Sequence, residues 1–278
     1  MHFDQPNWPD YQLLDSGDGA KLERLGSHTI VREEPMVCHP RTLSRETWDA
    51  ADTIYLDEKG WRHRPGTPET WTINFGPLTL TVRPAPGFKH IGIFPEQAPQ
   101  WQWMLNQTRP DTATPTKLLN LFGHTGAATL AAAHAGFIVT HVDSSRPAIN
   151  HARENQVLSN LGDAPIRWIQ EDVSKFIERE IKRDNRYDAI LLDPPAFGRG
   201  PKGQIWQIER DLPDILPRLQ KLLTDQYRFL FLNLYAGGLS IDSVKPLLQH
   251  HGNLKHGSFK LEAKNGPDLH MADWLCLQ

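Results

Sequence analysis

The sequence is poor in cysteine and contains no long apolar run. Only Cys38 and Cys276 occur among its 278 residues, and neither lies in a CxxC or Cys/His spacing. This pattern disfavours a disulfide framework or a zinc site and favours a reducing cytoplasm. No segment approaches the roughly 20 apolar residues that a membrane-spanning helix needs, and the start, MHFDQPNWPD, lacks the basic and apolar regions of a signal peptide. We therefore expect a cytoplasmic protein with no metal site and no membrane partner.

Positive charge is not in excess either. The formal net charge is −3 at pH 7, so the whole molecule is no polycation, and any nucleic-acid binding must use a local basic cluster. A hydrophobic content of 39% and nine tryptophans are enough for a real core. The length suits one large domain with a smaller one attached, and it does not indicate an oligomeric state.

Residues 1–87 do not show the alternation of strands and helices. Short strand-like runs alternate with turn signals, which predicts a small, mostly antiparallel β-rich domain with one helical turn near residues 43–52. We interpret its Trp48, Trp61 and Trp71 as core and cross-strand packing rather than as a platform for stacking bases.

Residues 88–116 contain too many glycines and prolines for one regular element, and they end in an expected short helix at 101–107. Two interpretations stay open for this connecting segment. It either covers the edge of the following sheet or forms a lid over a ligand, with Phe94 and Gln97 facing that ligand.

From residue 117 to residue 278 the chain alternates strictly. We expect strands at 117–122, 138–142, 166–169, 187–192 and 229–234, helices at 127–135, 148–158, 173–182, 212–223 and 241–248, and two final strands at 258–263 and 272–277. Residues 193–204 are expected to be an irregular loop. The alternation predicts a Rossmann-like α/β domain with a mostly parallel sheet and an antiparallel C-terminal edge hairpin. Ligands of such sheets bind at the carboxyl ends of the strands.

A glycine turn follows the first of these strands. Gly123, Thr125 and Gly126 lead directly into an alanine-rich helix, so the turn presents backbone N–H groups and allows a ligand to approach closely. The spacing is not GxGxxG and the turn has no lysine or arginine, which disfavours a dinucleotide and favours a ligand without phosphate at this point. S-adenosylmethionine (SAM) is such a ligand.

Three aspartates follow successive strands. Any one of Asp143, Asp172 and Asp193 would equally suit a helix cap or a turn, but three at equivalent positions favour a binding site. We expect Asp143 to accept hydrogen bonds from ribose hydroxyls and Asp172 from the amine of adenine. The backbone N–H of Val173 is expected to meet a ring nitrogen of the adenine.

The fourth strand is followed by DPPAF. Pro194 and Pro195 stiffen the backbone and have no N–H, so their carbonyls are expected to point outward as acceptors. Together with the carboxylate of Asp193 and the ring of Phe197, they suit recognition of a flat heterocycle whose amino group faces the methyl donor. The alternative is a rigid structural loop with Phe197 in the core.

The next residues, GRGPKG, add two cations in a glycine-rich loop. Arg199 and Lys202 suit contacts with phosphates, and a solvated loop is the alternative. A phosphate contact would make them part of a substrate site beside DPPAF.

Four segments taken together resemble a known family. NLFGHTGAATLAAAHAG, HVDSS, EDVSKFI and LLDPPAFGRGPKG are similar to the class I SAM-dependent methyltransferases, and most resemble the bacterial large-subunit ribosomal RNA methyltransferases that act on cytosine C5 and guanine N7. FKHIGIFPEQ resembles the segment before the first strand in that family, so the resemblance covers about residues 88–235. It implies that Asp193, Pro194, Pro195 and Phe197 face the acceptor. It also implies that SAM is held by Asn120, Phe122, Gly123, Thr125, Gly126, Asp143, Asp172 and Val173. We further expect Phe94 and Gln97 of the lid, and Ser144 beside Asp143, to belong to the cofactor site.

The sequence departs from the cytosine-C5 members at one point. Those members resemble one another in having a cysteine after the fourth or fifth strand, whereas this chain has DPPAF and NLYAGG there. Without a thiolate there is no covalent activation of a carbon acceptor, and we interpret Cys38 and Cys276 as buried packing residues.

The favoured function is methylation of a base nitrogen in RNA, with ribosomal RNA as the expected substrate. A methyltransferase for a small molecule or a protein, and a non-catalytic SAM-binding assembly factor, are the alternatives.

Overall fold

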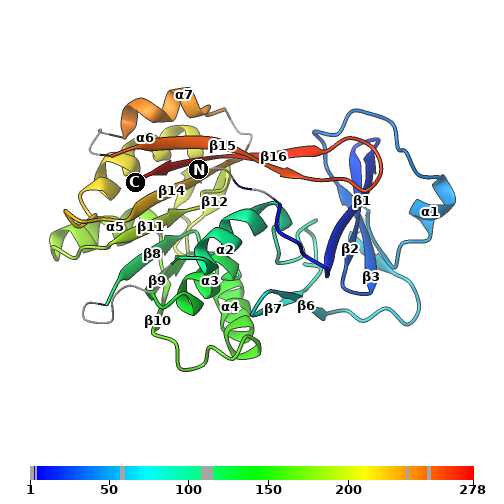
Figure 1. The fold of residues 1–278 in the computed structure, drawn as a ribbon, viewed down its shortest axis with the longest axis horizontal. Coiled ribbons are helices and arrows are strands. Elements are labelled where there is room, and N and C mark those ends of the chain that lie inside the picture. The colour runs from blue at the N-terminus through cyan, green and yellow to red at the C-terminus, as the bar shows by residue number, and fades with distance from the viewer. Residues whose placement is uncertain (1–2, 4, 57–59, 108–114, 236–237, 249–251) are drawn as a thin grey trace. The chain divides into compact units, whose positions relative to one another are not determined.

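The computed structural model describes residues 3, 5–56, 60–107, 115–235, 238–248 and 252–278. The chain forms two compact units (Figure 1). The larger unit contains Pro99–Phe259 and Met271–Gln278 together with the N-terminus up to Phe3, and the smaller contains Asp4–Ala98 and Lys260–His270. Residues 88–98, expected in a connecting segment, thus belong to the smaller unit, as does the tip of the C-terminal hairpin. The predicted domain limits, 1–87, 88–116 and 117–278, stay a prediction.

The larger unit is built on a seven-stranded sheet with the order β10-β9-β8-β11-β14-β16-β15. The strands are β8 (Lys117–Leu121), β9 (Ile138–Asp143), β10 (Ile166–Gln170), β11 (Ala189–Leu192), β14 (Phe229–Tyr235), β15 (Leu254–Leu261) and β16 (Leu269–Leu277). The first five are mutually parallel, and β16 is antiparallel to β14. The predicted Rossmann-like sheet with an antiparallel edge hairpin is confirmed.

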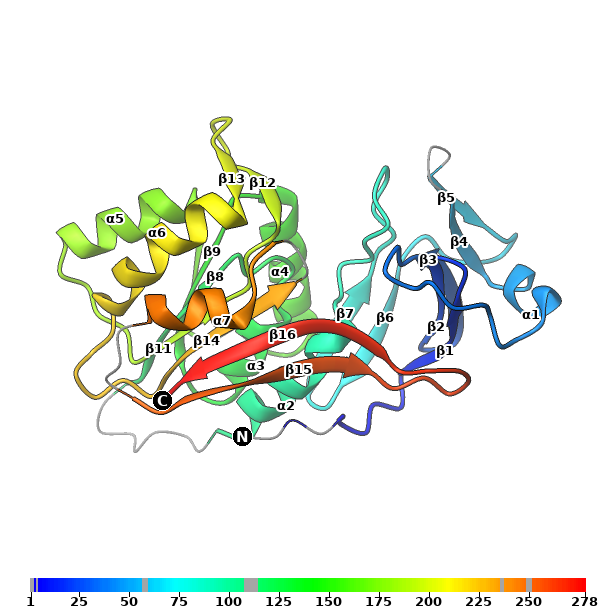
Figure 2. The same cartoon turned by 90° about the horizontal axis from the view of Figure 1, so that it is seen from above.

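Helices cover both faces of this sheet. They are α2 (Ala98–Leu105), α3 (Ala127–His134), α4 (Arg146–Leu158), α5 (Val173–Lys182), α6 (Ile208–Gln220) and α7 (Ile241–Val244), the last continued by the 3₁₀ helix η3 (Lys245–Leu247). Helices α3 and α4 lie on one face, and α5 and α6 on the other (Figures 1 and 2). The apolar stripes of α5 and α6, for example Phe176 and Leu216, pack on strand residues such as Leu119 and Leu192. Among the described residues no helix is both long enough and apolar enough to cross a membrane.

Several bounds differ from the prediction by a few residues, for example those of α2 (expected at 101–107) and β15 (expected at 258–263), and two elements differ further. Helix α6 starts at Ile208 rather than at residue 212 and continues through Pro213 and Pro217. Each proline removes one helical hydrogen bond, but the helix still buries an apolar stripe that includes Leu212 and Leu219, which offsets that loss.

The expected irregular loop 193–204 also contains regular structure. It holds β12 (Phe197–Arg199), which pairs with β13 (Ile205–Gln207) in an antiparallel two-stranded hairpin. The prediction of an irregular loop is therefore wrong for this segment.

The smaller unit has a five-stranded sheet, β1-β2-β3-β4-β5, and a separate hairpin, β6-β7. Its strands are β1 (Tyr11–Gly17), β2 (Ala20–Leu25), β3 (His28–Glu33), β4 (Thr53–Leu56), β5 (Gly60–His63), β6 (Trp71–Phe75) and β7 (Leu78–Val82), with the short helix α1 (Arg45–Asp49) between β3 and β4 and the 3₁₀ helix η2 (Pro95–Gln97) near its end. Trp48 is buried, and its indole N–H donates to Asp15 Oδ2 at 2.9 Å. Packing is therefore the role of this tryptophan, as interpreted from the sequence.

Candidate active site

The predicted ligand residues of the larger unit gather at one edge of its sheet. The strand order reverses between β8 and β11, and the carboxyl ends of both strands meet there. In open parallel sheets this reversal point is where ligands bind. The glycine turn follows β8, Asp143 ends β9, and Asp193 follows β11. The structure thus brings together the cofactor side and the acceptor side of the predicted site.

The turn after β8 has an unusual backbone. Phe122 and His124 adopt φ values of 56° and 48°, and Gly126 adopts 86°. Positive φ is uncommon for residues with a side chain, and such strain concentrates at functional sites. Backbone hydrogen bonds from Gly126 to Gly123 (3.0 Å) and from Gly123 to Val142 (3.1 Å) hold the turn in place. The strained turn is therefore fixed by the sheet beneath it.

A buried polar chain supports the turn from below. Asn120 Nδ2 donates to Thr129 Oγ1 at 2.8 Å, and this hydroxyl lies 2.9 Å from Nδ1 of His141. Burial lowers the pKa of His141 to about 3, so its ring is neutral at pH 7. A Cβ atom at Gly123 would lie 2.4 Å from Cε1 of His141. Only glycine fits above this ring. The amide nitrogen of Asn120 is thus bonded inside the protein. The predicted contact of this residue with SAM stays a prediction.

Replacing Gly123 by alanine should therefore disturb both the fold and the turn. The added methyl group must displace the His141 ring or the turn, since they would approach within 2.4 Å. Overpacking of this kind costs about 1–3 kcal/mol. We expect a lower melting temperature for Gly123→Ala by calorimetry, and little change for the control Gly162→Ala, where a Cβ meets nothing within 4 Å. Equal stability of the two variants would contradict this account of the turn.

Asp143 joins the turn to the end of β9. The carboxylate is buried; its Oδ2 accepts the backbone N–H of His124 at 2.9 Å and its Oδ1 that of Ser145 at 2.7 Å. Burial raises the pKa of Asp143, while these backbone donors act in the opposite direction. A carboxylate offers about four acceptor positions, so it keeps capacity for a ligand hydroxyl. The carbonyl of the neighbouring Ser144 accepts Gln170 Nε2 at 3.4 Å.

The remaining residues of the cofactor side have structural partners. Thr125 is buried, and its carbonyl accepts Asn155 Nδ2 at 3.0 Å. Asp172 caps α5 by accepting the backbone N–H of Lys175 at 3.1 Å, and Val173 is the first residue of that helix. The helix-cap interpretation of Asp172 is thus correct, and its contact with adenine stays a prediction.

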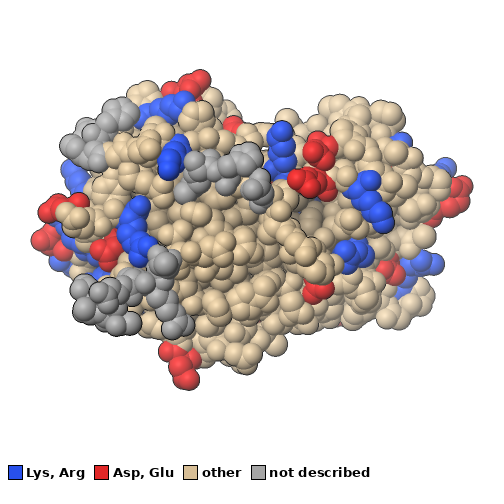
Figure 3. All heavy atoms as spheres, in the orientation of Figure 1, with Lys and Arg blue, Asp and Glu red and all other residues tan. Residues whose placement is uncertain are grey.

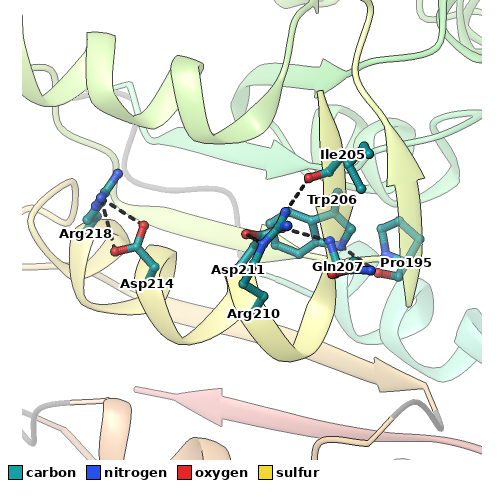
Figure 4. Close-up of polar contacts among 8 residues, drawn as sticks. All are labelled: Pro195, Ile205, Trp206, Gln207, Arg210, Asp211, Asp214 and Arg218. Atoms are coloured by element: carbon teal, nitrogen blue, oxygen red, sulfur yellow. Dashed lines mark hydrogen bonds and ion pairs between the residues drawn. The ribbon is translucent and has the colours of Figure 1, made fainter. Parts of the chain in front are cut away.

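On the acceptor side, Asp193 is held by a relay of amides. Asn233 Nδ2 donates to Asp193 Oδ1 at 3.1 Å, and Asn233 Oδ1 accepts Gln100 Nε2 at 3.3 Å. Pro194 is buried. The Pro195 carbonyl accepts the indole N–H of Trp206 at 2.7 Å (Figure 4). Trp206 thus uses one of the two lone pairs of this carbonyl, and the expected contact of Pro195 with the acceptor stays a prediction.

Phe197 lies on the surface. The alternative interpretation, a structural loop with Phe197 in the core, is therefore wrong. Its side chain is 54% exposed, whereas Trp206 is 7% exposed and its ring centre lies 4.8 Å from that of Phe122. Trp206 thus takes the core position, and it links the hairpin to the glycine turn. The predicted phosphate-binding residues Arg199 and Lys202 are both exposed on the same hairpin.

Sequence reasoning missed Asn233, Gln100, Trp206 and His141. Asn233 had a usable signal, because it is a polar residue near the carboxyl end of an apolar strand, FLFLNLY. Phe94 and Gln97 lie in the smaller unit, and their predicted contact with SAM stays a prediction.

One of the two cysteines is unsuited to nucleophilic attack. Cys276 is buried in β16, where burial raises its thiol pKa to about 12. Cys38 is exposed, so the interpretation of that residue as buried packing is wrong, and it lies in the smaller unit. Within the described ranges, no group of three or more His, Cys, Asp or Glu side chains is arranged to hold a metal ion.

Part of the chain is similar in sequence to curated proteins. No protein-family model matches the sequence. Two curated relatives, both "Ribosomal RNA large subunit methyltransferase K/L", come from Shewanella frigidimarina (32% identical over 59% of this chain) and Shewanella loihica (33% over 57%). The chain spans only 23% and 22% of the length of these relatives.

Solved structures match over nearly the whole chain. The crystal structure of SMU.776 complexed with SAH has a TM-score of 0.77, covering 98% of this chain and 76% of that one, but at 16% identity it shows the fold alone. The SAM-dependent methyltransferase from Agrobacterium tumefaciens is 36% identical with a TM-score of 0.91, covering 99% of this chain and 92% of that one. On that identity and coverage, the chain belongs to the SAM-dependent methyltransferases.

Proposed function

We propose that the protein transfers the methyl group of SAM to a base nitrogen of RNA, with ribosomal RNA as the favoured substrate. The observation that carries the proposal is the meeting of the turn, Asp143 and Asp193 at the reversal point of the sheet. The curated relatives named as ribosomal RNA methyltransferases support an RNA substrate. The exposed ring of Phe197 beside Arg199 and Lys202 supports it independently, because aromatic rings and cations together suit nucleic acid.

The residues on the cofactor side of the site suit SAM as a ligand. Gly123 and Gly126 let the turn pack closely on His141 and Ala152, Asp143 retains acceptor capacity for ribose hydroxyls, and the turn has no cation that would select a phosphate. SAM supplies an electrophilic methyl group. The residues of the larger unit proposed to hold it are Asn120, Phe122, Gly123, Thr125, Gly126, Asp143, Ser144, Asp172 and Val173.

The task of the acceptor side is orientation. Asp193, held by Asn233, accepts a hydrogen bond from an N–H of the base and so directs the nitrogen lone pair at the methyl group. The carboxylate would also stabilise the positive charge that develops as the nitrogen gains the methyl group and S-adenosylhomocysteine leaves. It would then accept the proton that the nitrogen loses. Holding donor and acceptor in this geometry supplies a large part of the acceleration. The thiol of Cys276 does not take part, since burial keeps it protonated.

Asp143→Ala should weaken SAM binding by about 1.5–3 kcal/mol, the scale for losing hydrogen bonds to a charged group. The turn also loses the acceptor of its His124 N–H, so the shape-conserving Asp143→Asn is measured beside it. Titration calorimetry gives both affinities, and Asp163→Ala, an exposed aspartate, is the matched control. Unchanged SAM affinity in folded Asp143→Ala would remove Asp143 from the proposed site.

The function itself is tested by transfer of tritiated methyl groups from SAM. Pools of RNA, protein and small molecules from cells lacking this protein are offered separately, and the labelled nucleosides are identified by mass spectrometry. We expect label in RNA and in one methylated base. Label only in protein or small molecules, or SAM binding without transfer to any pool, would establish one of the alternatives instead.

A further inference from the structure

The hairpin β12–β13 has two chemically different faces. Its register pairs Gly198 with Trp206 on one face and places Phe197, Arg199, Ile205 and Gln207 on the other. The first face is packed against the turn through Trp206. On the second, Phe197 is 54% and Ile205 50% exposed. The hairpin stands out from the body of the larger unit as a narrow arm (Figure 2). Exposed apolar side chains gathered on one face of such an arm indicate a binding surface.

The arm is braced at its base. The carbonyl of Ile205 accepts Arg210 Nη2 at 2.5 Å, and the N–H of Gln207 donates to Asp211 Oδ2 at 2.8 Å (Figure 4). Arg210 and Asp211 also form an ion pair with each other at 2.7 Å. Helix α6 therefore fixes the strand that carries Ile205.

The tip of the arm is closed by Gln204. Its Oε1 accepts the N–H of Lys202 at 2.9 Å, and its backbone carbonyl accepts the N–H of Gly200 at 2.7 Å. Since both ends of the arm are held, the exposed face is organised before any partner binds, which lowers the entropic cost of binding.

The charge of the arm is of one sign. Residues 197–207 contain Arg199 and Lys202 and no acidic residue, in a chain whose net charge is −3. Figure 3 shows acidic and basic side chains interspersed on the face that it draws. A short segment with two cations and no acid is thus a local basic cluster of the kind that an anionic chain requires.

The spacing of the apolar pair suits a base. Phe197 is opposite Gln207 and Ile205 is opposite Arg199, so Phe197 and Ile205 are diagonal neighbours, for which the separation is roughly 7–8 Å. At this separation the two side chains form one continuous apolar surface, against which the face of a base can lie. Bases within a duplex have both faces covered by their neighbours, whereas unpaired bases offer them to side chains.

We infer that the outer face of β12–β13 binds an unpaired nucleotide of the RNA, with its base against Phe197 and Ile205 and its flanking phosphates on Arg199 and Lys202. Because the other face of the arm packs on Phe122 of the turn, we place this nucleotide next to the methylated one. Phe197, which the resemblance implied to face the acceptor, thus contacts the neighbour of the acceptor instead. The inference rests on the proposed RNA substrate and makes its class specific, as an RNA whose target lies in a single-stranded segment.

The test compares binding to a labelled unstructured RNA with binding to a duplex hairpin of equal length, by fluorescence anisotropy. Phe197→Ala should weaken binding to the unstructured RNA about 5- to 100-fold, and Ile205→Ala about 3- to 10-fold. Binding to the duplex should change less than twofold. Val157→Ala is the matched control, since Val157 is 69% exposed and lies on α4 rather than on the arm. Melting temperatures of all variants should stay near that of the parent, because these side chains are exposed.

Salt dependence tests the phosphate contacts. Arg199→Ala and Lys202→Ala should each reduce the slope of log affinity against log salt by about 0.7, the value for one phosphate of a single strand. The control Lys182→Ala removes an exposed cation at the end of α5, and its slope should equal that of the parent.

Three outcomes would overturn the inference. The first is unchanged affinity of Ile205→Ala for unstructured RNA, and the second is equal weakening of unstructured and duplex RNA binding by Phe197→Ala. The third is that the parent protein self-associates in the ultracentrifuge and the Phe197→Ala and Ile205→Ala variants do not, while their RNA binding is intact. That outcome would make the arm a protein interface. Methyl transfer by the parent protein is measured on the same preparations. If the parent protein methylates RNA and the arm variants bind RNA as tightly as the parent, the inference alone is refuted. If the parent protein methylates no RNA, the proposed function is refuted.

Discussion

Asp193→Asn should lower the rate of methyl transfer in a single turnover by about 100- to 1,000-fold while SAM affinity changes less than twofold. The substitution keeps the shape of the side chain and removes its charge. Groups placed against charge that develops in the transition state contribute on this scale. The remaining amide no longer balances the positive charge on the attacking nitrogen, so the loss appears in the chemical step.

Asn233 should behave as a positioning residue for Asp193. Its Nδ2 donates to Asp193 Oδ1 at 3.1 Å, so Asn233→Ala should slow transfer about tenfold in the parent and hardly at all in Asp193→Asn, because residues that act as a unit are not additive. The matched control Asp214→Asn changes an exposed carboxylate of α6 that pairs with Arg218 (Figure 4), and its rate should equal the parent rate. Full transfer by folded Asp193→Asn would remove this residue from the mechanism.

Glu23→Ala should lower the free energy of unfolding of the smaller unit by about 3–5 kcal/mol, the cost of leaving the partner of a buried ion pair uncompensated. Glu23 is fully buried in β2, and its two oxygens accept Arg32 Nε at 2.5 Å and Nη2 at 2.9 Å. The hydroxyl of Tyr11 donates to the same carboxylate at 2.9 Å. Denaturant titration measures the loss. Glu178→Ala removes an exposed partner of Lys182 and should cost less than about 1 kcal/mol. Comparable costs for the two variants would contradict the assigned role of the buried pair.

The same pair predicts a loss of stability in acid. Burial alone would raise the pKa of Glu23, but the charge of Arg32 and its hydrogen bonds hold it at about 2, below the ordinary value of 4.5. A carboxyl whose pKa is depressed by folding stabilises the folded state above the unfolded pKa, and this contribution is lost as the pH falls from about 4.5 towards 2. Unfolding measured between pH 2 and pH 6 should show this slope, and Glu23→Gln should reduce it.

The sequence alone determined the architecture of the larger unit and the edge of the sheet that carries its site. Strict alternation of apolar runs and amphipathic segments requires parallel strands covered on both faces, and the carboxyl ends of such strands lie at one edge. The positions of Gly123, Asp143 and Asp193 at the carboxyl ends of their strands therefore followed from local pattern. Helix α5 has the predicted bounds, residues 173–182, because an N-cap and an apolar stripe within ten residues define it. The cytoplasmic location stays a prediction.

Only the tertiary structure decided which side chains meet. Asn233 and Asp193 are 40 residues apart, and they touch because β14 pairs with β11, a neighbourhood that no local pattern specifies. The arm also depended on packing. Its strands have three residues each, too few for alternation to show, and burial of Trp206 against Phe122 leaves Phe197 on the surface. The tip of the C-terminal hairpin joins the smaller unit, where the N–H of Lys264 donates to the carbonyl of Leu13 at 2.9 Å. Local sequence determines the helices and strands, because neighbouring residues limit the backbone conformation and the spacing of apolar residues sets which face is buried. Contacts between distant residues arise only when the sheet is assembled.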